Sequence, residues 1–136
     1  MFRLSIVTPE RVFYDGEVRS LVAPGTEGYL GVLSHHAPLI TALKPGKIEF
    51  RDDQDSMHVL AVSGGFLEVS HNIATILADA VEDASEIDIA RAQKALDLSK
   101  QRLISAGHGE TSIDLPSARA AVERASNRIK VYKDTH

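Results

Sequence analysis

The sequence predicts an α+β protein of the segregated kind, with an N-terminal antiparallel β-sandwich or flattened barrel followed by a C-terminal antiparallel two-helix hairpin. Two observations lead to this class. Up to Ala78, short runs rich in β-branched residues alternate with Gly, Pro, Asn and Asp, which is typical of strands and turns. After Ala78 the strong helix formers Ala, Leu, Lys, Arg and Gln take over. We therefore expect a β domain over residues 1–82 and a helical hairpin over residues 83–136.

The first strand is expected near the N-terminus, because Phe2, Leu4 and Ile6 alternate with residues that would point to the opposite face. Turn signals such as Pro24-Gly25 and Gly64-Gly65 separate the later runs. Many short strands with no helical pattern between them predict a sandwich or a small barrel. The further strands are expected at Val18–Ala23, Tyr29–Leu33, Lys47–Phe50, His58–Val62, Phe66–Ser70 and Ala74–Leu77.

The two helices are expected over about residues 88–106 and 115–133, because apolar or small residues recur there every three or four positions. Asp88 can cap the first helix, and Pro116 is tolerated in the first turn of the second. The Gly107-His108-Gly109 segment is expected to interrupt the helix at this point. The two seams can therefore cover one another only as an antiparallel hairpin. Ala or Ser occupies three of the six positions in the first seam and two of the six in the second, and the buried area is therefore small. We expect a tail that is held by its contacts and rearranges when they change. The seam residues are Ile89, Ala92, Leu96, Ser99, Leu103 and Ala106 in the first helix, and Leu115, Ala118, Val122, Ala125, Ile129 and Tyr132 in the second.

Composition narrows the classes of function. The 136 residues carry a net charge of -4 and no Cys, which removes disulfides, thiolate nucleophiles and Cys-based zinc sites and fits a reducing compartment. The opening residues do not resemble a signal peptide, and no apolar run reaches about 18 residues, so we expect a chain that neither leaves the cell nor spans a membrane by itself. Charge is uneven, because Leu115 to Lys133 carries five basic residues against the single acid Glu123.

No sequence pattern predicts catalysis. The glycines between Gly25 and Gly31 lack the spacing of a dinucleotide loop, and Ser63-Gly64-Gly65 lacks the glycine that precedes a nucleophilic serine. No two of the six histidines have the four-residue spacing of a helical metal pair. We therefore expect no catalytic residue and no metal site. A stand-alone β-sandwich ligand-binding module and a small hydrolase are the alternatives to a docking protein.

Two groups of charged residues are candidates for binding. The first is formed by Glu82, Asp88, Arg91, Arg124 and Arg128, where converging guanidinium groups could hold the phosphates of a nucleotide and a carboxylate could accept from its ribose or adenine. Spacing alone favours the alternative of solvated arginines and an acid at a helix N-terminus. The second is the basic stretch Arg119 to Lys133, either a solvated helix face or a docking surface for an acidic protein segment. Nucleic acid is not expected, because the β domain is acidic and offers no aromatic series for base stacking.

The ordered motifs resemble those of the epsilon subunit of bacterial F-type ATP synthase over essentially the whole chain. They are Ile6-Val7-Thr8-Pro9, Gly28 to Leu33, His36-Ala37-Pro38-Leu39, Val62 to Val69, Ala74 to Leu77 and Ile87 to Ala92. The resemblance implies a non-catalytic rotor subunit at the cytoplasmic face of the membrane, peripheral and attached only through the complex. Its β-sandwich would sit on the gamma subunit and the c-ring. Its hairpin would extend toward the beta and alpha subunits and inhibit ATP hydrolysis.

The same resemblance implies specific sites. Members that bind ATP carry an Ile/Leu-Asp-x-x-Arg-Ala motif and arginines on the second helix, which here correspond to Asp88, Arg91, Ala92, Arg124 and Arg128, with Glu82 as the upstream carboxylate. ATP would be a regulatory ligand that favours the folded tail, and no cofactor is required. For partners, Tyr29 and His36 are expected at the c-ring end, where Tyr29 replaces a common carboxylate and Ser34-His35 replaces a common Pro-Gly pair. The acidic segment of the beta subunit would meet Arg119, Arg124, Arg128, Lys130 and Lys133.

Overall fold

The computed structural model describes residues 1–107 and 115–135 and divides into two compact units, Met1–Asp83 and Ala84–His136. The first unit is all sheet apart from its connections, and the second is helical. This order of elements confirms the segregated α+β class that the sequence predicts.

The first unit contains nine strands, and the sequence anticipated most of them. The prediction missed β4 and β9 and the first half of β2, where Val12 to Glu17 carry a weaker alternation. The strands are β1 (Phe2–Val7), β2 (Val12–Gly25), β3 (Gly28–Val32), β4 (Leu39–Leu43), β5 (Gly46–Asp52), β6 (Met57–Val62), β7 (Gly65–Ser70), β8 (Ile73–Ala78) and β9 (Val81–Asp83).

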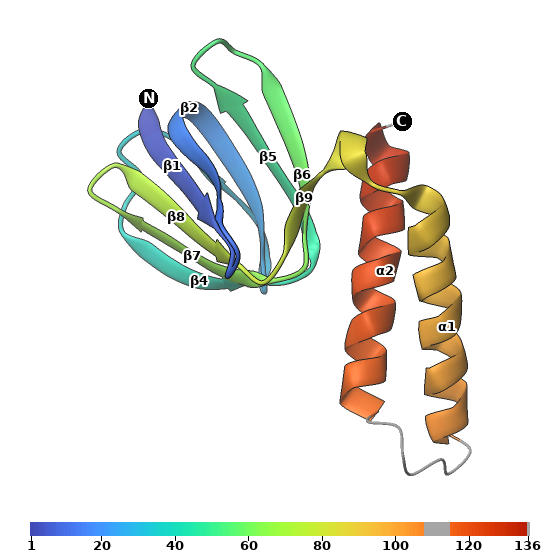
Figure 1. Ribbon diagram of the computed structural model, residues 1–136. Coiled ribbons are helices and arrows are strands. Elements are labelled where there is room, and N and C mark those ends of the chain that lie inside the picture. The colour runs from blue at the N-terminus through green and yellow to red at the C-terminus, as the bar shows by residue number, and fades with distance from the viewer. Residues whose placement is uncertain (108–114, 136) are drawn as a thin grey trace. The chain divides into compact units, whose positions relative to one another are not determined.

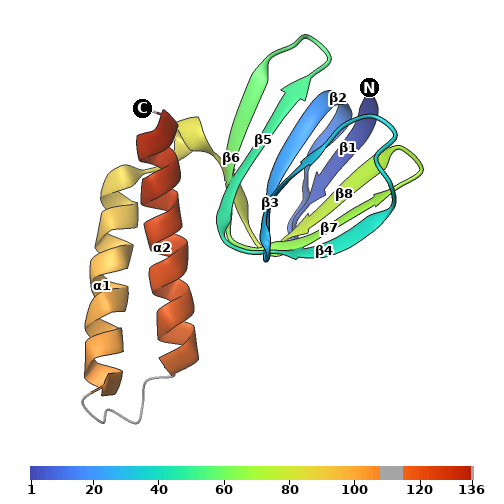
Figure 2. The ribbon, with the colours of Figure 1, turned by 180° about the vertical axis from the view of Figure 1, so that it is seen from behind.

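The sheet runs in the order β1-β8-β7-β4-β2-β5-β6-β9, with β3 paired to β2 and an additional pairing between β1 and β2. Strand β2 is 14 residues long and pairs with β1 through its first half and with β3 and β5 through its second. One long strand can thus belong to both layers, so the sheet folds over itself (Figures 1 and 2). The pairing of β1 with β8 is parallel, and the other pairings in this unit are antiparallel.

The core of the first unit lies between these layers and is built by residues that alternate along the strands. In β1 the side chains of Phe2, Leu4 and Ile6 are almost fully buried, as the period-two pattern predicts. Leu67 in β7 and Ile76 in β8 face each other across the ladder and are both 0% exposed. The core is therefore continuous and mostly aliphatic.

One end of this core is closed by an aromatic and ionic group on β2, β5 and β6. The His58 ring stacks on Phe50 with 4.5 Å between ring centroids, and Tyr14 lies 4.5 Å from Phe50. His58 Nε2 lies 2.8 Å from Asp52 Oδ2, while the backbone amides of Gln54 and Ser56 donate to Asp52 Oδ1 at 2.9 Å. The hydrogen bond from His58, followed by that from Ser56, lowers the pKa of Asp52. Burial, and then the nearby carboxylates, raise the pKa of Tyr14.

The second unit begins with a short 3-10 turn, η1 (Ala84–Glu86), followed by α1 (Ile89–Gly107) and α2 (Leu115–Thr135). Both helices begin and end within about two residues of the predicted positions. Gly107, which the sequence predicts as a breaker, is the last residue of α1. His108 and Gly109 lie outside the described residues.

The two helices of this unit pack through the predicted seam (Figure 1). Its buried cluster consists of Ala92, Leu96, Ala125 and Ile129, with Ile89, Ala95 and Val122 partly buried against it. Ser99 is also buried, and its hydroxyl donates a hydrogen bond to the Ala95 carbonyl at 2.7 Å. The helices therefore pack along the predicted line, and the area they bury is small because five of the twelve seam residues are Ala or Ser.

Candidate functional site

Asp88 fixes the start of the hairpin as its N-cap residue. Its Oδ1 accepts the backbone N–H of Arg91 at 3.0 Å, and its carbonyl accepts the N–H of Ala92 at 2.9 Å. The side-chain bond satisfies an amide that an isolated helix end leaves without a partner, and the bond to the Asp88 carbonyl is the first hydrogen bond within the helix. The capping role predicted for Asp88 is therefore confirmed, and Oδ2 is the oxygen that the cap does not use.

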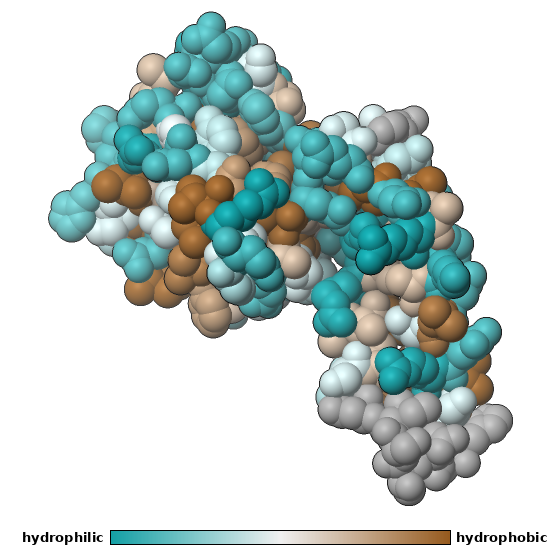
Figure 3. Space-filling view, viewed as in Figure 1, coloured by the Kyte–Doolittle hydropathy of each residue, from teal (hydrophilic) through white to brown (hydrophobic). Residues whose placement is uncertain are grey.

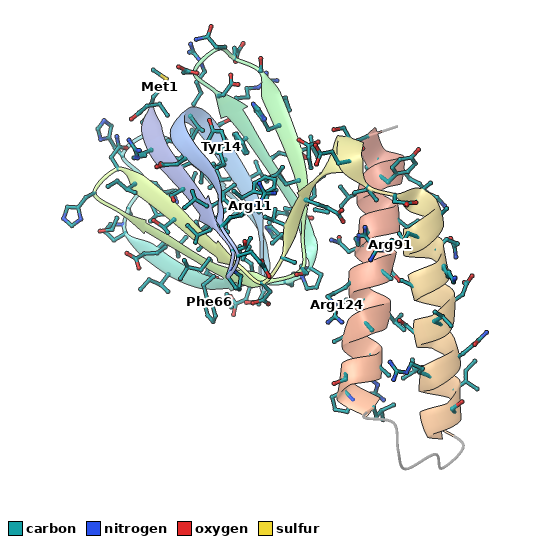
Figure 4. All side chains as sticks on the ribbon, viewed as in Figure 1. Met1, Arg11, Tyr14, Phe66, Arg91 and Arg124 are labelled. Atoms are coloured by element: carbon teal, nitrogen blue, oxygen red, sulfur yellow. The ribbon has the colours of Figure 1, made fainter. Side chains whose placement is uncertain are left out.

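Three arginines gather on one side of the hairpin, which we call the arginine flank (Arg91, Arg124 and Arg128). Each directly precedes a buried seam residue, namely Ala92, Ala125 or Ile129. Neighbouring residues on a helix are rotated by about 100°, so in an antiparallel pair the residues that precede the seam share one side. Figure 4 shows Arg91 near the beginning of α1 and Arg124 about midway along α2. The arginine convergence that the sequence predicts is thus compatible with the folded hairpin.

Two members of the predicted nucleotide group have different surroundings. Ala92 is 0% exposed in the seam, so it has no surface to contact a ligand and can contribute only by letting the helices approach closely. Glu82 belongs to the first unit, where it is half-buried in β9 opposite Ala61 of β6. Asp88 and the three arginines all belong to the second unit.

The opposite side of the hairpin is hollowed, a feature that the sequence did not predict. We call this depression the lysine groove. Lys130 and Lys133 were predicted as partner residues, but Lys100 from α1 was not, although it follows Ser99 in the seam as Lys130 follows Ile129. This shared position, directly after a seam residue, is the sequence signal by which Lys100 could have been predicted. The groove has a volume of about 480 Å³ and is lined by Gln93, Leu96, Lys100, Ser126, Ile129, Lys130, Lys133 and Asp134.

The residues predicted for the c-ring end lie in the first unit. Tyr29 in β3 is 53% exposed, and its hydroxyl accepts the backbone N–H of Lys47 at 3.0 Å, so it also ties β3 to β5. A Cβ at Gly46 would collide with Pro24 and would come within 2.9 Å of the Tyr29 hydroxyl, which explains the glycine there. His36 follows β3 in the loop to β4, and its Nδ1 lies 2.6 Å from the Ala37 carbonyl.

A further surface, the outer apolar face, was not singled out from the sequence. We define it as Val7, Ile40, Ala42, Phe66 and Leu77. Ala42, Phe66, Leu77 and Val7 form one row across β4, β7, β8 and β1, because each is opposite the next in the ladders. Phe66 is 58% exposed, Leu77 56% and Ile40 75%. Figure 3 shows apolar residues gathered over these strands, and in Figure 4 Phe66 lies at the surface of the sheet. Apolar patches of this kind are typical of protein interfaces.

Other kinds of site are not found in the part of the chain that the structure describes. Residues 1–107 and 115–135 contain no cluster of three or more His, Cys, Asp or Glu residues able to hold a metal. Over the same residues, neither helix combines the length and the apolar character needed to cross a bilayer.

Comparison with protein families decides the relationship. Residues 1–84 match the β-sandwich domain of the ATP synthase delta/epsilon chain, and residues 85–133 match the long α-helix domain of the same chain. The chain belongs to the ATP synthase delta/epsilon chain family. Together with the relatives described next, this match confirms the predicted resemblance to the epsilon subunit.

Individual relatives agree with this assignment. The ATP synthase epsilon chain of Desulforamulus reducens is 46% identical over 94% of this chain and 94% of its own length. That of Lacticaseibacillus casei is 40% identical over 100% of this chain and 96% of its own. As an epsilon chain, the protein is a non-catalytic subunit of ATP synthase, so the alternatives of a small hydrolase and of a stand-alone module lose their support.

Solved structures share the fold at much lower identity. A chain in the mitochondrial ATP synthase of Euglena gracilis, described with its c-ring, superimposes with a TM-score of 0.79 at 20% identity, covering 98% of this chain and 80% of that one. A chain of the Tetrahymena thermophila mitochondrial ATP synthase central stalk and c-ring gives a TM-score of 0.60 at 15% identity, covering 98% and 94%.

Proposed function

We propose that this epsilon chain is a central-stalk subunit of an F-type ATP synthase, bound peripherally at the cytoplasmic face of a bacterial membrane through the complex. Its β unit would couple rotation of the c-ring to the catalytic head by contacting the gamma subunit and the c-ring. Its hairpin would restrain ATP hydrolysis when it extends toward the beta and alpha subunits. Bound ATP would favour the folded hairpin. The observation that carries the regulatory part is the thin seam, which can exchange its few buried residues for contacts with a neighbour.

Docking of the β unit is supported by the outer apolar face. A row of apolar side chains across four strands is left exposed to water. Its burial against a partner would stabilise the complex by about 25 cal/mol for each Å² of apolar area. An apolar core of this kind with a polar surround is what a lasting interface needs. We therefore assign the gamma contact to this face, with Tyr29 and His36 kept as candidates for the c-ring.

A pair of substitutions tests that assignment. The Phe66→Ser/Leu77→Ser double variant should lose co-purification with the gamma subunit, because central aromatic and aliphatic anchors account for most interface energy. Leu98→Ser is the matched control, since Leu98 is 53% exposed on α1 and lies outside the face. Retained gamma binding in the double variant, with the sheet still folded, would contradict the assignment.

Inhibition by the hairpin is supported by its charge. Arg119, Arg124, Arg128, Lys130 and Lys133 give α2 a strong positive field that suits an acidic segment of the beta subunit. Removing residues 87–136 should leave a folded β unit and raise ATP hydrolysis by the assembled enzyme. Unchanged hydrolysis after reassembly with the truncated chain would rule out restraint by the tail.

ATP binding is supported by the arginine flank and by the uncapped Oδ2 of Asp88. Three guanidinium groups on one side suit phosphate oxygens, which arginine binds in bidentate fashion. If only the folded form binds, ATP at about 100 times its dissociation constant would favour folding by roughly 2.7 kcal/mol. That free energy is enough to move a balanced switch.

Calorimetric titration of the full chain with ATP tests this site. Arg124→Ala and Arg128→Ala should each weaken ATP binding strongly. Arg119→Ala is the control and should leave binding nearly unchanged, because Arg119 directly follows the seam residue Ala118 and so lies on the other side of the hairpin. Asp88→Asn is a sharper probe, because the amide oxygen keeps the N-cap while the negative charge is lost. Equal affinity in the wild-type chain and in both arginine-flank variants would leave the arginines as solvated surface residues.

A further inference from the structure

The lysine groove is a site in its own right, formed by both helices. Lys100 comes from α1, whereas Lys130 and Lys133 come from α2. Leu96 and Ile129 form its floor, and each belongs to the buried seam cluster. The depression therefore exists only while the two helices are paired.

The groove is strongly biased toward anions. Its walls carry three ammonium groups against the single carboxylate of Asp134, together with hydrogen-bonding groups from Gln93 and Ser126. Lysine is a compact point charge that binds phosphate groups without a fixed bidentate geometry. All three lysines are exposed, so they can adjust to the spacing of the negative charges they meet.

The size of the groove selects a small ligand. Its volume of about 480 Å³ falls within the range of about 300–1,000 Å³ that small-molecule sites occupy. Its lining spans residues 93–100 and 126–134, which is a length of about 12 Å along each helix. A partner helix would extend well beyond it, whereas a chain of a few phosphate groups would fit within its length.

We propose that the lysine groove binds a short inorganic polyphosphate, and that the bound anion holds α1 and α2 together by bridging Lys100 with Lys130 and Lys133. This site is distinct from the arginine flank. Lys100, Ser126 and Lys130 directly follow buried seam residues, while Arg91, Arg124 and Arg128 directly precede them. The two sets therefore lie on opposite sides of the hairpin, and the proposal does not depend on ATP binding.

Titration of the full-length chain with tripolyphosphate tests the proposal. Lys100→Gln and Lys133→Gln should each weaken binding several-fold, and the double variant should weaken it further. Lys94→Gln is the matched control, because Lys94 is an exposed α1 lysine that does not line the groove. Arg124→Gln is the second control and should retain wild-type affinity. Far-UV circular dichroism should show equal helix content in all four single variants.

Hydrogen exchange supplies a readout that simple charge attraction would not move. Tripolyphosphate should slow exchange of seam amides in both α1 and α2 of the wild-type chain, and the effect should disappear in the Lys100→Gln/Lys133→Gln variant. Equal weakening by Lys94→Gln would show attraction by net charge alone, and loss of binding in Arg124→Gln would move the anion to the arginine flank. Either result, or the absence of saturable binding at millimolar tripolyphosphate, would overturn the proposal.

Discussion

The β unit and the helical hairpin bury their apolar residues in different ways. In the β unit, two curved layers enclose one continuous core, and Leu4, Ile6, Ile48, Leu67 and Ile76 are each 0% exposed. In the hairpin, two helices can cover each other only along a line, and Leu96 and Ile129 each remain 8% exposed in a small cluster. Enclosure by a closed sheet makes a rigid platform, whereas a single shared seam makes an element that can be separated.

The two units also differ in the kind of residue that they expose. The β unit keeps an apolar row outside as well as inside, which suits lasting attachment to a partner. The hairpin carries its charges beside the seam, with arginines on one side and lysines on the other. A charged surface binds ligands and acidic segments that come and go. We expect the first unit to anchor the subunit and the second to respond to what it binds.

The largest expected effect is the difference in stability between alanine substitutions at two glycines of the β unit. Gly65 has φ +146°, and a Cβ there would fall on the carbonyl oxygen of Leu77, so Gly65→Ala should destabilise the sheet by more than about 4 kcal/mol. Gly28 has φ +133° but no atom within 4 Å of its Cβ position, so Gly28→Ala should cost only about 1–3 kcal/mol of backbone strain. Urea denaturation of both variants measures the difference. Equal destabilisation would mean that contact with Leu77 is relieved by movement.

A second prediction compares equivalent truncations in the two cores. Ile76→Ala should lower the free energy of unfolding of the β unit by about 2–5 kcal/mol, because it leaves a cavity in an enclosed core. Leu96→Ala should accelerate hydrogen exchange in α1 and α2 by the equivalent of about 2 kcal/mol while leaving the sheet amides unchanged. If Leu96→Ala also speeds exchange in β7 and β8, the two units unfold together and the comparison fails.

A third prediction concerns the N-cap of α1. Asp88→Ala removes the oxygen that accepts the Arg91 amide, and should destabilise the helix by about 1 kcal/mol. Asp88→Asn should be close to neutral in the absence of ATP, because Asn caps as well as Asp does. Helix content followed during thermal unfolding distinguishes the two. A loss in Asp88→Asn as large as in Asp88→Ala would indicate that charge, and not the hydrogen bond, stabilises this end.

The smallest effect is expected in the turn between β5 and β6 and depends on pH. Because hydrogen bonding by His58 and Ser56 lowers the pKa of Asp52 below 3.8, its ionised form contributes stability above that value and loses it as pH falls through the folded-state pKa. Asp52→Asn should therefore be less stable than wild type near neutral pH and should converge with it in acid. Thermal unfolding across the acidic range would show this convergence. A constant difference would exclude ionisation of Asp52 as its cause.

The sequence was most informative where local pattern and burial agree. The alternation of Phe2, Leu4 and Ile6 was enough for β1, and the three-four spacing around Leu96 and Ile129 was enough for both helices. It failed for β4, where Leu39 to Leu43 follows Pro38 and exposes Ile40, so no clear alternation is present. It also failed for β9, a strand of three residues whose side chains are all half-buried.

The candidate sites likewise divide into those that local sequence spacing predicts and those that only the tertiary structure brings together. Asp88 and the arginines could be named from spacing, because their positions depend on one helix turn. The outer apolar face could not, since Val7, Ala42, Phe66 and Leu77 are distant in sequence and meet only through the strand order. Lys100 was missed for the same reason, because it completes the groove from the other helix.

The sequence by itself determined the class of each unit, the helix ends and the charges of α2, since these follow from neighbours a few residues apart. Tertiary structure decided which strand joins the two layers, which apolar residues stay outside, and which lysines share a groove. Those outcomes depend on pairing between distant segments, and the free energy of such pairing comes from burial over the whole unit and not from any local run of residues.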